Sequence, residues 1–224
     1  MIDTVDTTDS IPIFPLPGAV LYPETVLPLH VFEPRYRDLV RDVTAGDNRL
    51  ALALLRPGYE NEYTGAPPIH TVATIGRIEN LRLHPDGRSN FDLVGVERVD
   101  LEEVPSEHSY RMARYVVRDE TEVDAADADI KRARVELFAA HNMLMTEIAD
   151  ESGHPLSVDA VLPYATVVNG ACANLPVDAE IRQQLLEIDD IQERQRRVAD
   201  HVREALERIL ALKAETGQMD GPTN

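Results

Sequence analysis

The sequence predicts an α+β protein: a mostly antiparallel β unit that carries one helix, followed by an all-α part. Apolar residues recur at a period near two through 72–118 and at a helical period from residue 130 onward. A run with six acids and no base, 119–129, separates the two patterns. The predicted organisation is a β-rich part over 11–118, an acidic linker and helix start over 119–129, an α-helical subdomain over 130–213, and frayed tails at 1–10 and 214–224.

Prolines interrupt the N-terminal segment between residues 11 and 34. Each proline removes a backbone donor and fixes φ, so only short strands fit there, and we expect them at 12–14 and 26–29. Pro34 suits the first turn of a helix, where its missing N–H costs nothing. Apolar residues at helical spacing and a glycine beyond them predict a helix over 34–45: Tyr36, Leu39, Val40, Val43 and Gly46.

The rest of the first half is expected to form strands. The apolar run 49–55 is typical of a strand buried on both faces. Patterns that alternate over 72–83 and 91–104 flank a turn sequence, Pro85-Asp86-Gly87, and predict a hairpin. The segment 110–118 is expected to return as the last strand.

The second half is expected to be helical throughout. Apolar residues at alternating steps of four and three predict a long helix from residue 130 until Gly153 and Pro155 end it. Ser157 can cap a second helix ending near residue 170, with Pro163 kinking or shortening it. A third helix runs to 188, and Asp189 is expected to cap the last one, of about 25 residues.

Composition excludes several classes of partner. The chain has 22 basic and 40 acidic residues and a net charge of −18, a field that repels phosphate backbones and anionic lipids. We therefore expect neither nucleic-acid nor membrane partners. Cys172 is the one cysteine, so no internal disulfide forms, and the start of the chain lacks a secretory pattern. These features predict a cytoplasmic protein.

No motif for catalysis or cofactor binding is present in the sequence. Neither Lys131 nor Lys213 follows a glycine, so a phosphate-binding P-loop is excluded. The seven histidines never stand three or four residues apart, which argues against a helical metal pair. His141, on the apolar stripe of its helix, is expected to be packed and hydrogen-bonded, and Cys172 to be a core residue. We expect no enzyme activity, no metal and no cofactor.

The loop over 56–68 contains two tyrosines, Tyr59 and Tyr63, between glycines and prolines. No strand or helix period places both in a core. They either form an exposed aromatic lip of a binding groove or seal the loop against the sheet. The sequence leaves both hypotheses open.

Three blocks of the chain resemble the N-terminal domain of Lon proteases in its stand-alone form. The first is IPIFPLPGAVLYPETVLPLHVFEPRYRDLV, over 11–40. The second contains Gly76-Arg77-Ile78, Asp86-Gly87-Arg88 and Gly95-Val96-Glu97-Arg98, and the third is LPVDAEIRQQLLEIDDIQERQRRV, over 175–198. The resemblance implies a PUA-like β unit followed by a helical bundle. Two signature residues also have structural roles, since Arg35 and Tyr36 can tie the helix to the sheet.

In Lon proteases this domain precedes an ATPase and a Ser-Lys peptidase, and it helps to recognise unfolded or tagged substrates. The chain is expected to stop before both catalytic parts. The resemblance therefore implies a non-enzymatic substrate-recognition module that binds unfolded or extended polypeptide, or an adaptor partner, without ATP.

A groove between the β unit and the helices is the expected site for an extended apolar segment. Six residues are expected to line it: Tyr22, His30, Phe32, Leu55, Tyr59 and Tyr63. The acidic surface favours clients with basic flanks. Two alternatives stay open: a small-ligand sensor or uncharacterised hydrolase on the same fold, and an interaction protein that self-associates through its C-terminal helix.

Overall fold

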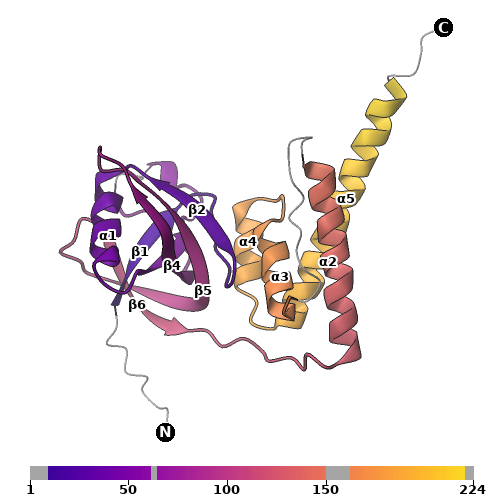
Figure 1. Cartoon of the computed structure of the whole chain (residues 1–224), viewed down its shortest axis with the longest axis horizontal. Coiled ribbons are helices and arrows are strands. Elements are labelled where there is room, and N and C mark those ends of the chain that lie inside the picture. Colours follow the sequence, from indigo (N-terminus) through magenta and orange to yellow (C-terminus); the bar gives the residue numbers. More distant parts are fainter. Residues whose placement is uncertain (1–9, 62–64, 150–161, 220–224) are drawn as a thin grey trace. The chain divides into compact units, whose positions relative to one another are not determined.

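A computed structural model of the chain describes residues 10–61, 65–149 and 162–219. The chain divides into two compact units. We call Met1–Glu120 with Val177–Asp189 the sheet unit, and Thr121–Pro176 with Asp190–Asn224 the helical unit. The α+β class is confirmed (Figure 1). Residues 177–189, which were expected in the helical subdomain, group with the strands.

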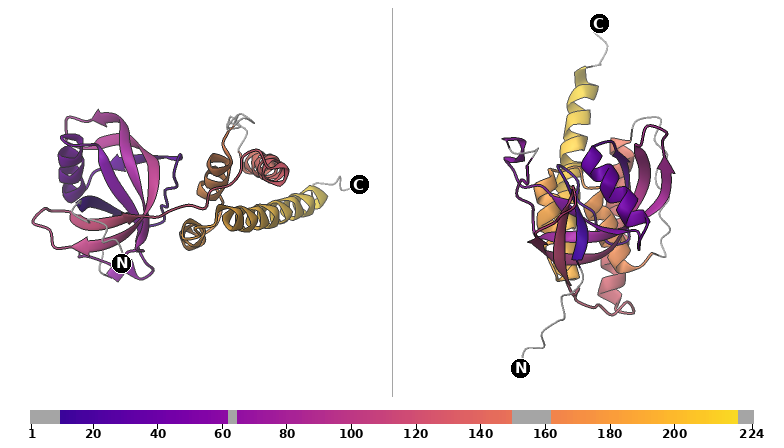
Figure 2. Two further views of the ribbon diagram at one scale, coloured as in Figure 1. Left: turned by 90° about the horizontal axis from the view of Figure 1, so that it is seen from below. Right: turned by 90° about the vertical axis from the view of Figure 1, so that its left-hand side faces the viewer.

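The sheet unit contains one six-stranded sheet. Its strands are β1 (Ser10–Leu16), β2 (Val26–Val31), β3 (Arg49–Leu54), β4 (Val72–Leu83), β5 (Ser89–Val104) and β6 (Arg111–Val117). Their order is β2-β5-β4-β3-β1-β6, and β5 also pairs with β6, so the sheet curls round on itself (Figure 2). Every pairing is antiparallel except β1 with β3. Strand β2 pairs only with the first half of β5, and its other edge has no neighbouring strand in the described sheet.

A close backbone approach shapes the start of β2. The Glu24 amide donates to the Gly95 carbonyl at 2.9 Å, and the Gly95 amide donates to the Thr25 carbonyl at 2.9 Å. A Cβ on Gly95 would lie 2.0 Å from the carbonyl oxygen of Tyr22. Only glycine therefore lets the turn over 22–25 contact β5 this closely.

Helix α1 (Pro34–Thr44) matches the predicted helix to within one residue. Its buried face is the predicted one: Tyr36, Leu39, Val40 and Val43. This face packs in one core cluster with strand residues such as Leu50 and Leu93. The Tyr36 hydroxyl donates to the Pro15 carbonyl at 3.3 Å, as expected for a tie to the sheet, whereas Arg35 pairs with Glu33 at 3.1 Å.

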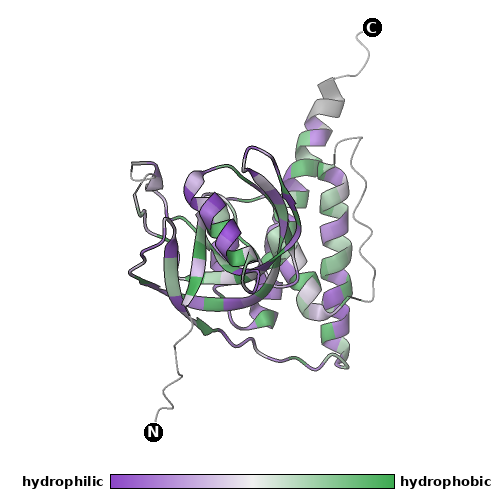
Figure 3. Ribbon diagram, turned by 60° about the vertical axis from the view of Figure 1, so that its left-hand side comes forward, coloured by the Kyte–Doolittle hydropathy of each residue, from purple (hydrophilic) through white to green (hydrophobic). Residues whose placement is uncertain are grey.

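Four more helices complete the described chain. They are α2 (Ala128–Ile148), α3 (Tyr164–Ala173), α4 (Ala179–Leu186) and α5 (Ile191–Met219), with a 3₁₀ turn, η1 (Tyr59–Asn61), in the sheet unit. Helix α3 begins directly after Pro163, and the predicted cap, Ser157, lies outside the described residues. Apolar and polar residues are interspersed along α2 and along the coloured part of α5 (Figure 3). None of the helices described here is long and apolar enough to cross a membrane.

The cap of α5 differs from the prediction. The Asp190 carboxylate accepts from the amides of Gln192 and Glu193 at 2.8 and 3.2 Å, so Asp190 and not Asp189 caps the helix. Asp189 instead accepts from Arg98 at 3.0 Å and from Arg118 at 2.7 Å. We call Arg98, Arg118 and Asp189 the arginine clasp. The sequence alone could not show which of the two adjacent aspartates caps the helix, because the role of Asp189 depends on arginines more than 70 residues away in the chain.

The clasp makes stability depend on pH. Burial alone raises the pKa of Asp189, but the hydrogen bond and charge of Arg118, together with Arg98, lower it below 3.8 overall. A lowered pKa in the folded state means that this stabilisation is present above the unfolded value and is lost as the pH falls through the folded one. We expect Asp189→Asn to be less stable than the native chain near neutral pH. The difference should shrink between about pH 5 and pH 2, measured by thermal unfolding across that range.

Candidate functional site

The structure separates the six residues expected to line a groove. Tyr22 and Leu55 are buried, with 0% and 4% of their surfaces exposed. The Tyr22 hydroxyl donates to the Arg182 carbonyl at 2.5 Å, and Leu55 belongs to a core cluster. Tyr59 packs partly against that same cluster, and Tyr63 lies outside the described residues. Tyr22 and Leu55 therefore stabilise the sheet unit and are not accessible to a ligand.

The other two residues, His30 and Phe32, are exposed and adjacent. Their ring centroids are 6.1 Å apart in a stacked arrangement, and the centroid of His84 lies 6.4 Å from that of His30. We call His30, Phe32 and His84 the ring cluster. Phe32 is 61% exposed, which is unusual for a large apolar side chain beside two other rings. The cluster is an exposed aromatic surface in which the His30 and His84 rings meet edge to face.

Asn90 orders the two histidines. The His30 Nδ1 atom lies 2.5 Å from Asn90 Oδ1, and Asn90 Nδ2 lies 3.1 Å from His84 Nε2. His30 faces Asn90 across the β2–β5 ladder, which explains the first contact. His84 and Asn90 were missed from the sequence because neither stands near His30 in the chain. The hairpin turn at 85–87 and the β2–β5 register together bring them there.

A shallow cavity of about 400 Å³ adjoins the ring cluster. It lies over β2, β4 and β5, and its lining includes apolar, amide and charged groups: Pro28, Leu29, His30, Asn80, Arg82, Asn90, Phe91 and Asp92. The size is in the range that holds a few side chains of a peptide. The ring cluster and this cavity thus lie next to each other, beside the edge of β2 that has no neighbouring strand in the described sheet.

The described residues show no cluster of candidate metal ligands. They contain no group of three or more His, Cys, Asp or Glu side chains that could hold a metal ion. Burial raises the pKa of Tyr110 and of Tyr164 to about 12, with the Tyr110–Asp42 hydrogen bond adding to the first shift. Both phenols therefore stay protonated at neutral pH.

His141 and Cys172 lie in the core of the helical unit. Cys172 is fully buried, as predicted for a core residue. His141 is 8% exposed, but its Nε2 atom has no hydrogen-bond partner among the residues that the structure describes, so the predicted hydrogen bond is not found there. Burial lowers the pKa of His141, which keeps its ring neutral.

Comparison with known proteins identifies similar sequences and folds. The profile of the ATP-dependent protease La (LON) substrate-binding domain matches residues 10–204. Lon protease 2 of Myxococcus xanthus is 29% identical over 211 residues, which cover 89% of this chain and 24% of that protein. The Lon protease of Flavobacterium johnsoniae is 25% identical over 190 residues, covering 83% and 23%. The chain thus spans about a quarter of the length of these curated relatives.

Two solved structures share the fold. A Lon N-terminal domain protein from Xanthomonas campestris superposes with a TM-score of 0.61 at 22% identity, covering 85% of this chain and 96% of that one. The N-terminal domain of a Mycobacterium avium complex Lon protease gives a TM-score of 0.64 at 18% identity, covering 87% and 98%.

Proposed function

This chain belongs to the Lon substrate-binding domain family, and from that premise we propose that it is a non-enzymatic recognition module that binds unfolded or extended polypeptide without ATP. The observation that carries the proposal is the exposed ring cluster beside the open edge of β2. Unfolded chains differ from folded ones in exposing apolar side chains, and an exposed Phe32 stacked on the His30 imidazole is a surface that recognises them.

Side chains of the client supply most of the affinity in this proposal. Strand β2 leaves one edge without a neighbouring strand, which invites an extended segment. Pro28, in the middle of β2, has no amide hydrogen, so a full ladder of backbone hydrogen bonds cannot form along that edge. The client therefore lies beside β2 and places apolar side chains on the ring cluster and in the adjoining cavity.

Charge adds selectivity to this weak apolar binding. The net charge of −18 attracts clients with basic flanks and repels acidic ones, and it acts on the association rate more than on the final affinity. We expect binding to acidic polypeptides to strengthen with added salt, and binding to basic ones to weaken.

Phe32→Ala is expected to weaken binding of an apolar unfolded peptide about fivefold, because about 1 kcal/mol of ring burial is lost. Fluorescence anisotropy with a labelled peptide measures the effect. Val117→Ala, which truncates another exposed apolar side chain at the end of β6, is the matched control and should leave the affinity unchanged. Equal affinity of the Phe32→Ala variant and the native chain would place the site elsewhere.

The two tyrosines of the loop over 56–68 are a second candidate contact for the same client. We propose that Tyr59 and Tyr63 add a second contact, so the Tyr59→Ala/Tyr63→Ala variant should bind more weakly while keeping its circular dichroism spectrum. If this variant binds as the native chain does and Phe32→Ala does not, recognition depends on the ring cluster alone. If neither variant changes the affinity, the peptide binds elsewhere on the chain. If no peptide binds at all, a small ligand or a dedicated protein partner becomes the better hypothesis.

A further inference from the structure

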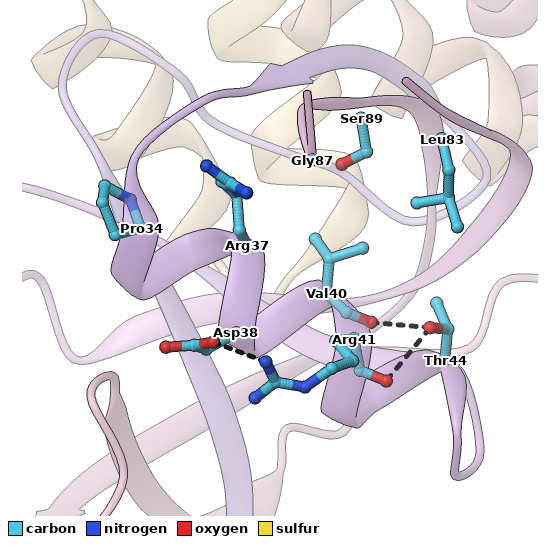
Figure 4. A pocket seen from close by; sticks show the side chains of 9 residues that line it. All are labelled: Pro34, Arg37, Asp38, Val40, Arg41, Thr44, Leu83, Gly87 and Ser89. Atoms are coloured by element: carbon cyan, nitrogen blue, oxygen red, sulfur yellow. Dashed lines mark hydrogen bonds and ion pairs between the residues drawn. The ribbon is translucent and has the colours of Figure 1, made fainter. Parts of the chain in front are cut away.

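A second cavity, of about 480 Å³, lies between α1 and the β4–β5 turn (Figure 4). Its lining combines apolar and charged groups: Pro34, Arg37, Asp38, Val40, Arg41, Thr44, Leu83, Gly87 and Ser89. It is distinct from the ring cluster. Leu83 and Ser89 are paired across the β4–β5 ladder, and the preceding pair, Arg82 with Asn90, faces the other cavity. Successive pairs point to opposite faces of a sheet, so the two cavities lie on opposite sides of this hairpin.

Two arginines, Arg37 and Arg41, line this cavity, and they differ in their partners. Among the described residues the side chain of Arg37 forms no hydrogen bond and no ion pair, although Asp38 is its neighbour in the chain. The two oxygens of Asp38 are already occupied, by Arg41 at 2.6 Å and by Ser109 at 2.9 Å. Arg37 therefore keeps a full set of guanidinium donors for an external anion.

Gly87 makes room for the Arg37 guanidinium. Its φ of 84° lies in the left-handed region, and a Cβ there would be 1.8 Å from Arg37 Nη2. The guanidinium thus lies against the bare backbone of the turn. Figure 4 shows it extending from α1 toward Gly87, with the Ser89 hydroxyl turned toward the same side.

Ser89 provides a second donor. The residue is 2% exposed, and its Oγ atom has no hydrogen-bond partner within the described chain. A buried hydroxyl without a partner costs free energy, and it is satisfied when a ligand oxygen enters the cavity. An open cavity that contains a guanidinium and a hydroxyl, both without a hydrogen-bond partner in the described chain, suits an anion.

We propose that this cavity binds the carboxyl-terminal carboxylate of a polypeptide whose last side chain is apolar. One guanidinium and one hydroxyl match the single charge and two oxygens of a carboxylate, and the nearby Asp38 carboxylate opposes a doubly charged phosphate. Val40, Leu83 and Pro34 supply an apolar wall beside these donors. A chain terminus presents its carboxylate and an apolar side chain from the same carbon atom, which fits that arrangement.

The inference rests on the proposed function, because its ligand is a polypeptide. The test compares two labelled unfolded peptides that end in leucine and differ only in a free or an amidated carboxyl terminus. We expect the free acid to bind about tenfold more tightly to the native chain. A third peptide, amidated but with a glutamate near its end, tests whether a side-chain carboxylate serves equally well. It should bind like the amide.

Arg37→Gln and Ser89→Ala should each remove the preference for the free acid. Arg77→Gln removes the same charge as Arg37→Gln from an exposed ion pair with Glu79, and it should keep the preference. Ser89→Ala should also unfold at an equal or higher temperature than the native chain, because it deletes an unpartnered buried hydroxyl. A weaker affinity in a variant that is equally stable cannot be ascribed to misfolding.

The outcomes separate this inference from the proposed function. Equal binding of acid and amide overturns the inference and leaves polypeptide recognition standing. A preference that survives both Arg37→Gln and Ser89→Ala also overturns it, since the carboxylate then binds elsewhere. Tight binding of the glutamate peptide replaces the chain terminus with an acidic side chain as ligand. Failure of all three peptides to bind contradicts the proposed function itself.

Discussion

Gly95→Ala is expected to leave the sheet unit unfolded or severely destabilised, by more than about 3 kcal/mol. The added Cβ would lie 2.0 Å from the Tyr22 carbonyl oxygen and 2.8 Å from its carbonyl carbon. These are backbone atoms, and the same carbonyl accepts from the Thr25 amide and hydroxyl at 3.2 and 2.8 Å. If the turn over 22–25 moved away from β5 to make room for the Cβ, it would lose these hydrogen bonds and the two backbone hydrogen bonds that it forms with Gly95.

Another glycine provides the matched control. Gly170, inside helix α3, has nothing within 4 Å of the position that a Cβ would take. Gly170→Ala should therefore stabilise the helical unit by about 0.5–1 kcal/mol through helix propensity. Chemical denaturation followed by circular dichroism measures both variants. A Gly95→Ala protein as stable as the native chain would contradict the close packing of the turn on β5.

Arg98→Met is the second change with a large expected effect, a loss of about 3 kcal/mol. Arg98 is 3% exposed and donates to the Leu186 and Ile188 carbonyls at 2.9 and 3.2 Å, besides Asp189. Methionine fills a similar volume, but its side chain has no hydrogen-bond donor. The buried carbonyls then lose a partner, and Asp189 keeps only Arg118.

The readout for Arg98→Met is local as well as global. Hydrogen exchange should accelerate around residues 186–190, where the clasp holds the chain, and the unfolding midpoint should fall. Arg77→Met removes an exposed arginine from β4 and should cost less than about 0.5 kcal/mol. If both variants are equally stable, the buried guanidinium does not hold this turn.

The secondary structure of the sheet unit could be predicted from sequence because local rules determine it. The alternation of apolar and polar residues predicted β4 with both ends correct. Pro34, followed by apolar residues at helical spacing, predicted α1. The parallel pairing of β1 with β3 and the grouping of α4 with the strands depend on contacts between distant residues. The burial of Arg98 could not be predicted either, because an arginine in an alternating strand is ordinarily expected to be exposed.

The candidate site could be predicted only in part. Exposed aromatic residues indicate a binding surface, and His30 and Phe32, which the sequence singled out on this ground, are exposed in the structure. Tyr22 was expected beside them, but its hydroxyl finds the Arg182 carbonyl 160 residues away and the ring is buried. Arg37 and Ser89 gave no signal at all, because what distinguishes them is the lack of a partner, which only the folded arrangement establishes.

The most direct test of polypeptide recognition is a titration of one labelled protein in two states. A client locked unfolded, for example by reduction and alkylation of its cysteines, and its native form are each titrated with this chain at physiological salt. We predict binding at micromolar concentrations for the unfolded client and none for the native one, with Phe32→Ala weakening the first. Equal binding of both states, or of neither, would contradict a module that recognises unfolded polypeptide.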